Sequence, residues 1–248
     1  MLPSSVTNYT ESREQMGMEI EITAADGEIF AGYLALPKTT PAPGIVVLPE
    51  VFNTNRHIRS VADGYAEDGF VALAPDVYWR QEAGCYLPYT DDGRAKAQAL
   101  RAQMDTDQFA RDLGDTVAEL REHDACTGKV GVMGFCLGGK FTYLSSVRHK
   151  IDAAVSYYGV QIHEHLDEAD GLNCPLIMNF AENDPHVPAD TVETIRARMG
   201  DMDNVQIHIY PGTEHGFNRF GYDPYNEAQA AIARDRTLAH FRQYLGGT

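Results

Sequence analysis

The sequence has few basic residues and no long apolar run. Its 248 residues include 20 Lys and Arg against 36 Asp and Glu, which gives a net charge of −16 at pH 7. A surface of this charge repels a phosphate backbone, so we expect no nucleic-acid partner. No stretch approaches the roughly 20 uninterrupted apolar residues of a membrane helix, and residues 1–15 lack the basic-then-apolar pattern of a signal peptide. We therefore expect a cytoplasmic protein with no membrane partner.

Cysteines are also few, and none forms a close pair. The four are Cys85, Cys126, Cys136 and Cys174. Without a CxxC spacing, a zinc site or a redox pair has little support. For three of them we expect reduced, buried thiols. Cys136 differs because of the residues around it, and we expect the protein to need no metal and no cofactor.

The chain lacks internal repeats, low-complexity tracts and a convincing linker. Its length is within what a single α/β domain uses around one sheet. Apolar residues make up 44% and charged residues 23%, the proportions of a folded globular protein. We predict one domain over residues 1–248, with residues 1–16 as a loosely ordered N-terminal extension.

The hydrophobic pattern that is present predicts an α/β fold. Met18–Thr23 alternates with the period of a half-buried strand and should form a hairpin with residues 28–36. Residues 45–48 are continuously apolar, as in a strand covered on both faces of a parallel sheet. Strands and helices then alternate, which predicts a mostly parallel sheet with helices on both faces. Later strands are expected at 70–74, 129–133, 152–158, 176–181 and 204–210, and helices at 57–68, 92–123 (interrupted near 106), 138–147, 189–199 and 226–244.

The most informative motif is Gly-Phe-Cys-Leu-Gly-Gly at 134–139. It follows a predicted strand, precedes an apolar helix and matches the G-x-S-x-G nucleophile elbow with Cys136 in place of serine. The tight turn of such an elbow requires glycines two positions away on either side. The helix would favour a thiolate by its dipole and offer the Leu137 N–H to an oxyanion. A glycine-rich turn with an incidental cysteine is the alternative, and the context favours a nucleophile.

An elbow of this kind requires an acid and then a histidine on later loops. Asp184 lies just past the strand predicted at 176–181, although Asp-Pro is also a common turn or cap. His215 follows the last predicted strand. Its competitors are less well placed, because His186 is too near the acid in sequence and His208 lies inside a strand. We therefore predict His215 as the base and Asp184 as the residue that orients it.

Four motifs together resemble the dienelactone hydrolase family, also known as the carboxymethylenebutenolidases, within the α/β-hydrolase superfamily. They are Ala-Pro-Asp-Val-Tyr at 74–78, the elbow at 134–139, Tyr-Tyr-Gly-Val at 157–160 and Pro-Gly-Thr-Glu-His-Gly-Phe at 211–217. The resemblance covers nearly the whole chain after about Met16. It implies the α/β-hydrolase fold, and the cysteine at the elbow separates this chain from serine-type relatives.

The resemblance also implies roles for residues that the spacing alone does not single out. Glu50 matches a glutamate that contacts the resting thiol and helps to generate the thiolate, and Val51 N–H would be the second oxyanion donor. Arg80 and Arg219 match arginines that hold a substrate carboxylate, and Tyr157 matches a tyrosine of the pocket. Because the net charge is strongly negative, an anionic substrate would need such a local basic pocket.

The expected reaction is hydrolysis of an ester or lactone through a thioester acyl-enzyme. The Cys136 thiolate would attack the carbonyl while Leu137 and Val51 hold the oxyanion, and His215 would activate water for deacylation. The resemblance implies dienelactone as substrate and maleylacetate as product, in the degradation of chloroaromatic compounds. The oligomeric state is left open, and a monomer is plausible.

Three alternatives remain at this point. One is a general carboxylesterase or thioesterase of the same fold, which activity on neutral esters would reveal. Another is a cysteine amidotransferase, but those enzymes place a glutamate two residues after the histidine, where this chain has Phe217. The third is a binding protein without catalysis, which the complete set of Cys136, His215 and Asp184 argues against.

Overall fold

One sheet organises the protein. Within residues 15–246, the part of the chain that the computed structural model describes, eight strands pair in the order β1-β2-β4-β3-β5-β6-β7-β8. The pairs β1–β2 and β2–β4 are antiparallel, and every later pair is parallel. The predicted α/β-hydrolase fold with an opening hairpin is confirmed. The strands are β1 (Met18–Thr23), β2 (Ile29–Ala35), β3 (Ala42–Leu48), β4 (Val71–Pro75), β5 (Cys126–Phe135), β6 (Ala153–Tyr157), β7 (Leu176–Ala181) and β8 (Val205–Tyr210).

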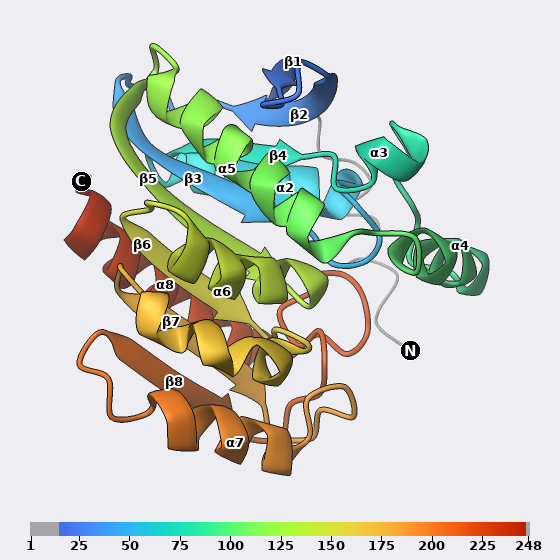
Figure 1. Ribbon diagram of the computed structural model, residues 1–248, viewed down its shortest axis with the longest axis vertical. Helices are drawn as coiled ribbons and strands as arrows, with labels where there is room; N and C mark the ends of the chain where they lie inside the picture. The colour runs from blue at the N-terminus through green and yellow to red at the C-terminus, as the bar shows by residue number, and fades with distance from the viewer. Residues whose placement is uncertain (1–14, 247–248) are drawn as a thin grey trace.

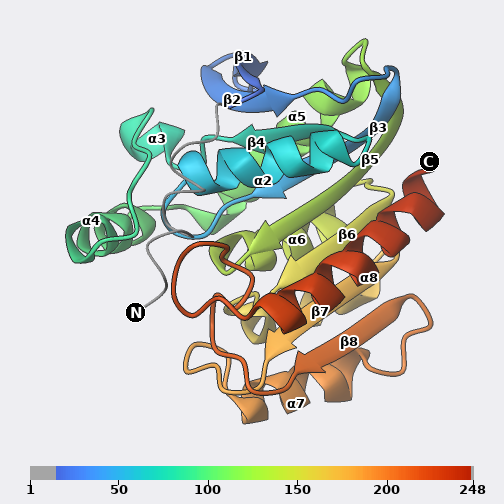
Figure 2. The same ribbon diagram turned by 180° about the vertical axis from the view of Figure 1, so that it is seen from behind.

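Helices cover both faces of the sheet. In Figure 1, α5 (Thr106–Glu122), α6 (Leu137–Arg148) and α7 (Ala189–Met199) lie in front. Figure 2 shows α2 (Arg56–Glu67) and α8 (Glu227–Leu245) on the opposite face. The short helices α3 (Trp79–Glu82) and α4 (Asp91–Arg101) lie beyond the end of the sheet, and η1 (Ile162–Gly171) is a 3₁₀ segment after β6. No helix within residues 15–246 is long and apolar enough to cross a membrane.

The predicted break in the long helical stretch is real. Residues 91–122 form two helices, and the Asp105 carboxylate caps the second by accepting the N–H groups of Asp107 and Gln108. A cap of this kind satisfies donors that have no partner inside the helix. The helices α3 and η1 were not predicted. Of the predicted N-terminal extension, residues 1–14 lie outside the described residues.

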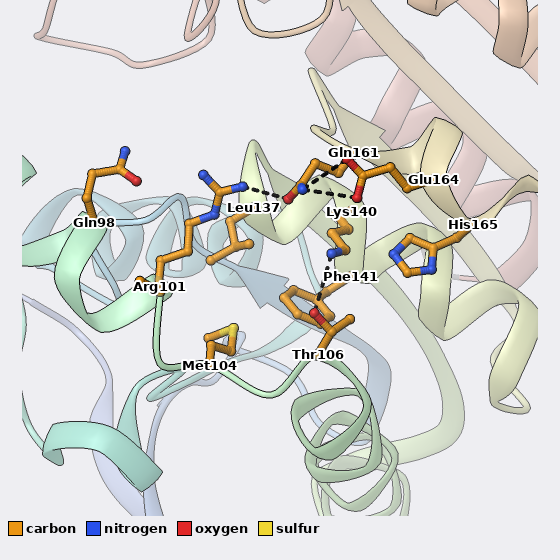
Figure 3. Close-up of a pocket in the computed structure, with 11 residues that line it drawn as sticks. Gln98, Arg101, Met104, Thr106, Leu137, Lys140, Phe141, Gln161, Glu164 and His165 are labelled. Atoms are coloured by element: carbon orange, nitrogen blue, oxygen red, sulfur yellow. Dashed lines mark hydrogen bonds between the residues drawn. The ribbon is translucent and has the colours of Figure 1, made fainter.

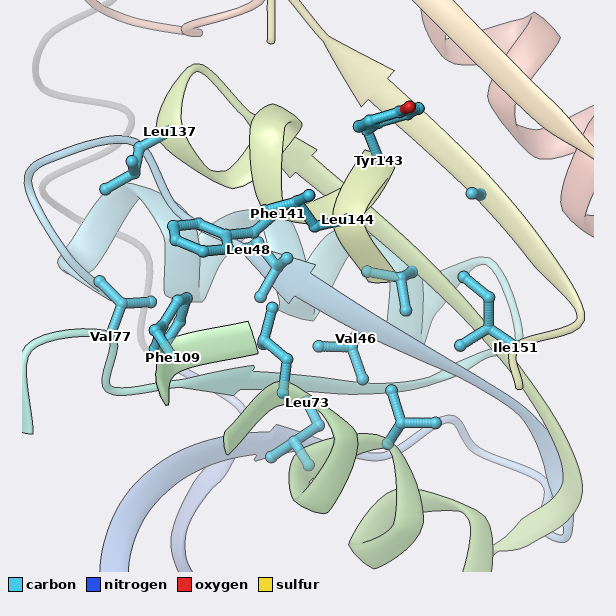
Figure 4. Packing of buried hydrophobic residues seen from close by; sticks show 14 of the residues in the cluster. Val46, Leu48, Leu73, Val77, Phe109, Leu137, Phe141, Tyr143, Leu144 and Ile151 are labelled. Atoms are coloured by element: carbon cyan, nitrogen blue, oxygen red, sulfur yellow. The ribbon is translucent and has the colours of Figure 1, made fainter. Parts of the chain in front are cut away.

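The central strand β3 shows why the sheet is buried on both faces. Val46 and Leu48 belong to the core beneath α5 and α6, whereas Ile45 and Val47 belong to the core beneath α2 and α8. Figure 4 shows the first of these cores, with Phe141 of α6 packed over β3. Side chains alternate along a strand, so a continuous apolar run contacts both layers. Each fully buried aliphatic side chain contributes roughly 1.5–3 kcal/mol.

The parallel strands bring their carboxyl ends to one edge of the sheet. Loops after parallel strands meet at that edge, which is where α/β proteins bind their ligands. The predicted site residues follow β3, β4, β5, β7 and β8 at positions 50–51, 80, 136–137, 184 and 215–219, and Tyr157 is the last residue of β6. The topology therefore gathers segments that are far apart in sequence.

Candidate active site

Cys136 occupies a strained turn between β5 and α6. Its backbone adopts φ 54° and ψ −110°, a left-handed conformation that is unusual for a residue with a side chain. A Cβ at Gly138 would lie 2.5 Å from the carbonyl oxygen of Leu48, and a Cβ at Gly134 would collide with the carbonyl of Gly138. Both glycines are therefore required by close backbone approach. Strain of this kind persists only where the surroundings hold it, and it concentrates at functional sites.

His215 and Asp184 form a hydrogen-bonded pair. His215 Nδ1 lies 2.7 Å from Asp184 Oδ2, while Asp184 Oδ1 accepts the N–H groups of His186 and Val187 at 2.8 and 3.2 Å. Both carboxylate oxygens are thus held in place. With its proton on Nδ1, the imidazole keeps Nε2 free, and this buried atom has no hydrogen-bond partner among residues 15–246. The pair has the geometry of an oriented general base.

The electrostatics of His215 connect it to Cys136. Burial alone would lower the pKa of His215, but its interactions with Cys136 and with Asp184 outweigh burial and raise this pKa to about 10. The influence of Cys136 on this pKa requires the thiol and the imidazole to be near neighbours. Cys136, His215 and Asp184 therefore lie together at this edge of the sheet.

Two backbone N–H groups remain free beside the elbow. In the described part of the chain, neither the Leu137 nor the Val51 N–H has an acceptor. The loop with Val51 is anchored on two sides, because Tyr78 donates its hydroxyl to Val51 O at 2.9 Å and Gly138 N donates to Pro49 O at 3.0 Å. Free donors on a fixed backbone are what an oxyanion hole needs.

Glu50 and Arg219 also lie at this edge, but they pair with each other. Arg219 Nε and Nη2 donate to the two Glu50 oxygens at 2.9 and 2.8 Å, and both side chains are buried. Burial would raise the pKa of Glu50, but Arg219 holds it below its usual value. The arginine also stacks over Tyr89, 4.7 Å from the ring centre. The resemblance implied a contact of Glu50 with the thiol and of Arg219 with substrate, and in this structure each is instead the partner of the other.

Arg80 is bound by two carboxylates of this chain, and its predicted contact with a substrate stays a prediction. It donates to both oxygens of the buried Asp112 at 2.8 and 2.9 Å, and Asp26 lies 2.8 Å away. The short helix α3 turns the side chain toward α5 and toward the turn of the first hairpin, a direction that sequence position does not reveal.

The side chain of Tyr157, the predicted pocket tyrosine, packs against α8. Tyr157 is fully buried, and its hydroxyl lies 2.6 Å from the Thr237 hydroxyl on α8. Its neighbour Tyr158 is the residue that reaches the site, with ring centres 4.9 Å apart between Tyr158 and His215. Tyr158 lies beyond the end of β6 with φ 38°, and both rings belong to the core beneath α2 and α8. Strand alternation therefore does not separate the two tyrosines, and the backbone turn after β6 decides which ring contacts His215.

Comparison with known proteins gives the family. A model of the dienelactone hydrolase family matches residues 30–245. The chain belongs to the dienelactone hydrolase family. It is therefore a hydrolase that acts on ester or lactone bonds.

Its relatives in the dienelactone hydrolase family match over most of their length. A protein of Azospirillum brasilense is 36% identical over 233 residues, which are 92% of this chain and 99% of the relative. The carboxymethylenebutenolidase of Pseudomonas putida is 31% identical over 220 residues, 88% of this chain and 93% of the relative. A crystal structure of a Klebsiella pneumoniae protein superposes with a TM-score of 0.83 at 29% identity, covering 92% of this chain and 98% of that one.

Proposed function

We propose that this member of the dienelactone hydrolase family uses Cys136 as nucleophile, His215 as base and Asp184 as the residue that orients the base. The observation that carries the proposal is the conjunction of a strained cysteine at the elbow with a histidine whose Nε2 is free and whose Nδ1 is held by a carboxylate. By the resemblance and the name of the P. putida relative, the substrate we propose is dienelactone.

The proposed reaction has two steps. The Cys136 sulfur attacks the carbonyl carbon after its proton has passed to Glu50, and the Leu137 and Val51 N–H groups hold the oxyanion. The ring C–O bond then breaks as that proton is delivered to the leaving oxygen. For a lactone, the leaving oxygen stays attached to the acyl group. His215 then takes a proton from water, and the hydroxide releases the free acid and regenerates the thiol.

For Glu50 and Arg219 we propose an exchange of partners. Removing one member of a buried ion pair costs about 3–5 kcal/mol, whereas a new hydrogen bond to a charged group contributes about 1.5–3 kcal/mol. If a substrate carboxylate binds Arg219 in place of Glu50, Glu50 stays buried without its partner. Binding is therefore favourable only if Glu50 also loses its negative charge. Accepting the proton of the Cys136 thiol would do so, because a neutral carboxyl is far less costly to bury. Substrate binding would then generate the thiolate.

A general carboxylesterase or thioesterase is the second candidate function. This candidate is favoured because both arginines already bind carboxylates of the chain. Arg80 is bound to Asp112 and Asp26, and Arg219 is bound to Glu50. Neither predicted carboxylate-binding arginine is free. Higher catalytic efficiency on simple neutral esters than on cis- or trans-dienelactone would support this candidate.

The test is turnover by wild type and by the Cys136→Ala variant. We expect the variant to fold normally and to lose hydrolysis of dienelactone and of neutral esters, as followed by absorbance. A thiol alkylator should inactivate the wild type with modification at Cys136, and the buried Cys174 serves as the internal control. Labelling of Cys85 or Cys174 with Cys136 unmodified, or an active Cys136→Ala enzyme, would contradict the proposal.

A further inference from the structure

A cavity of about 460 Å³ opens beside the elbow. It is bounded by the end of α4, the segment before α5, the first turns of α6 and the start of η1, and Leu137, the residue after Cys136, lines it. Figure 3 shows Arg101 and Lys140 reaching this space from different elements, with Gln161 near both. Its volume is in the range of small-molecule sites, about 300–1,000 Å³.

Lys140 is a buried cation without a carboxylate. Only 5% of the residue is exposed, and its one recorded polar contact is the Thr106 hydroxyl, 3.5 Å from Nζ. In the described part of the chain, no Asp or Glu oxygen lies within ion-pair distance of Nζ. A buried charge without a partner is unfavourable, and the pKa of Lys140 is accordingly lowered, with burial as the main cause. An anion in the cavity would remove this penalty.

Arg101 is a second cation without an ion-pair partner among residues 15–246, although it is only half-buried. Its Nη2 donates to Gln161 Oε1 at 2.6 Å, an amide acceptor that leaves the guanidinium charge uncompensated. The carboxylate of Glu164 is nearby, but it accepts the Gln161 amide at 3.1 Å and forms no ion pair with either cation among residues 15–246. By contrast, Arg80 and Arg219 both bind carboxylates directly. In a chain with 36 acidic and 20 basic residues, a cavity lined by two cations that form no ion pair, with the Glu164 carboxylate bound to the Gln161 amide, marks a place for an external anion.

We propose that Arg101 and Lys140 form a subsite for a carboxylate that is separated by several atoms from the scissile ester bond. The proposal rests on the proposed role of Cys136. Lys140 is four residues beyond Cys136, and four residues of α-helix advance about 6 Å along the axis. The subsite therefore recognises a longer anionic ester than a lactone whose carboxylate would bind at Arg219. The carboxylate stands in either the acyl or the alcohol part of that ester.

The test uses two series of esters, each with a neutral control. Phenyl half-esters of succinic, glutaric, adipic and suberic acid carry the carboxylate in the acyl part, and acetate esters of ω-hydroxy acids carry it in the alcohol part. Methyl-capped analogues are the neutral controls. For wild type we expect kcat/KM to favour the anionic member in one series, with the preference largest at one chain length. The series that shows this preference tells whether the acyl part or the alcohol part of the ester enters the cavity.

The variants are Arg101→Gln and Lys140→Gln. Each should lower the anionic-to-neutral ratio of kcat/KM by roughly 10- to 100-fold, the effect of losing one charged hydrogen bond. The matched controls are Arg111→Gln and Lys150→Gln, which remove exposed cations that do not line the cavity. Their ratios should remain at the wild-type value. Arg101→Glu, at a partly exposed position, should shift preference toward an ester that carries a trimethylammonium group, and it tests the subsite even if a Lys140 variant fails to fold.

Two failures are distinguishable. The subsite would be overturned if wild type showed no preference for the anionic ester in either series, or if the Arg101→Gln and Arg101→Glu variants kept the wild-type ratio. If turnover of the neutral esters still depended on Cys136, the proposed nucleophile would stay intact. Turnover that survives Cys136→Ala would overturn the proposed function, and the subsite with it.

Discussion

Two groups of basic side chains lie beside the elbow, Arg219 in one and Arg101 with Lys140 in the other, and they differ in which groups balance their charge. Arg219 is bound by both oxygens of Glu50, whereas Arg101 and Lys140 have only an amide and a hydroxyl as acceptors. The charge of the first group is balanced, and the second keeps its positive charge. The type of a residue therefore says little about its use. Whether a carboxylate lies within reach decides which cation is available to a substrate.

The largest effect on stability is expected from removing one partner of the Glu50–Arg219 ion pair. Glu50→Ala leaves the Arg219 guanidinium buried without its partner, which should lower the free energy of unfolding by about 3–5 kcal/mol. The double variant Glu50→Gln, Arg219→Met leaves no buried charge and should lose less. Urea denaturation at pH 7 measures both. A double variant as unstable as Glu50→Ala would show that packing, rather than the ion pair, makes this region stable.

The pH dependence of this pair follows from the lowered pKa of Glu50. The unfolded-state value is about 4.3, so the contribution of the pair is complete above that pH and is lost as pH falls through the lower folded-state value. Stability measured from pH 6 to pH 2 should therefore decline more steeply in wild type than in the double variant. Parallel curves would argue against an ionised Glu50.

A smaller effect is expected at Arg80, whose charge is also balanced. Arg80→Gln takes two hydrogen bonds from the buried Asp112, which keeps contacts with Trp79 and Gln108. The loss in unfolding free energy should be about 1–3 kcal/mol. Because Asp112 and Asp26 bind the Arg80 guanidinium, its variant should keep the wild-type ratio of efficiencies on anionic and neutral esters. A selective loss on the anionic ester would return Arg80 to the substrate site.

The smallest effect, and one of opposite sign, is expected at Lys140. Lys140→Met removes a buried charge that has no carboxylate partner, so stability at pH 7 should stay equal or rise. The folded-state pKa of Lys140 is lowered, so the unfolded chain binds more protons and wild type gains stability as pH rises through that value toward about 10.4. The advantage of the methionine variant should therefore shrink between pH 7 and pH 10. A clear loss of stability at pH 7 would mean that Lys140 has a partner in solution.

Short-range pattern explains why much of the fold was predictable. The period of residues in β1, the apolar run in β3 and the break before α5 are properties of adjacent residues, and the structure has each of them. The elbow is equally local, because the close backbone approach that excludes side chains occurs within the motif and with β3. Asp184 and His215 could be proposed as acid and base because chain order and the ends of β7 and β8 restrict where such residues can stand.

What the sequence by itself determined was therefore the sheet, the elbow and the order of Cys136, Asp184 and His215. Only the tertiary structure decided the partners of the charged residues. Arg219 and Glu50 are 169 positions apart, and Arg80 meets Asp112 because α3 turns toward α5. The free charge of Arg101 and Lys140 is likewise a property of the folded chain. Side-chain direction and long-range ion pairing depend on which elements pack together, and electrostatic interactions act across that packing without regard to distance along the chain.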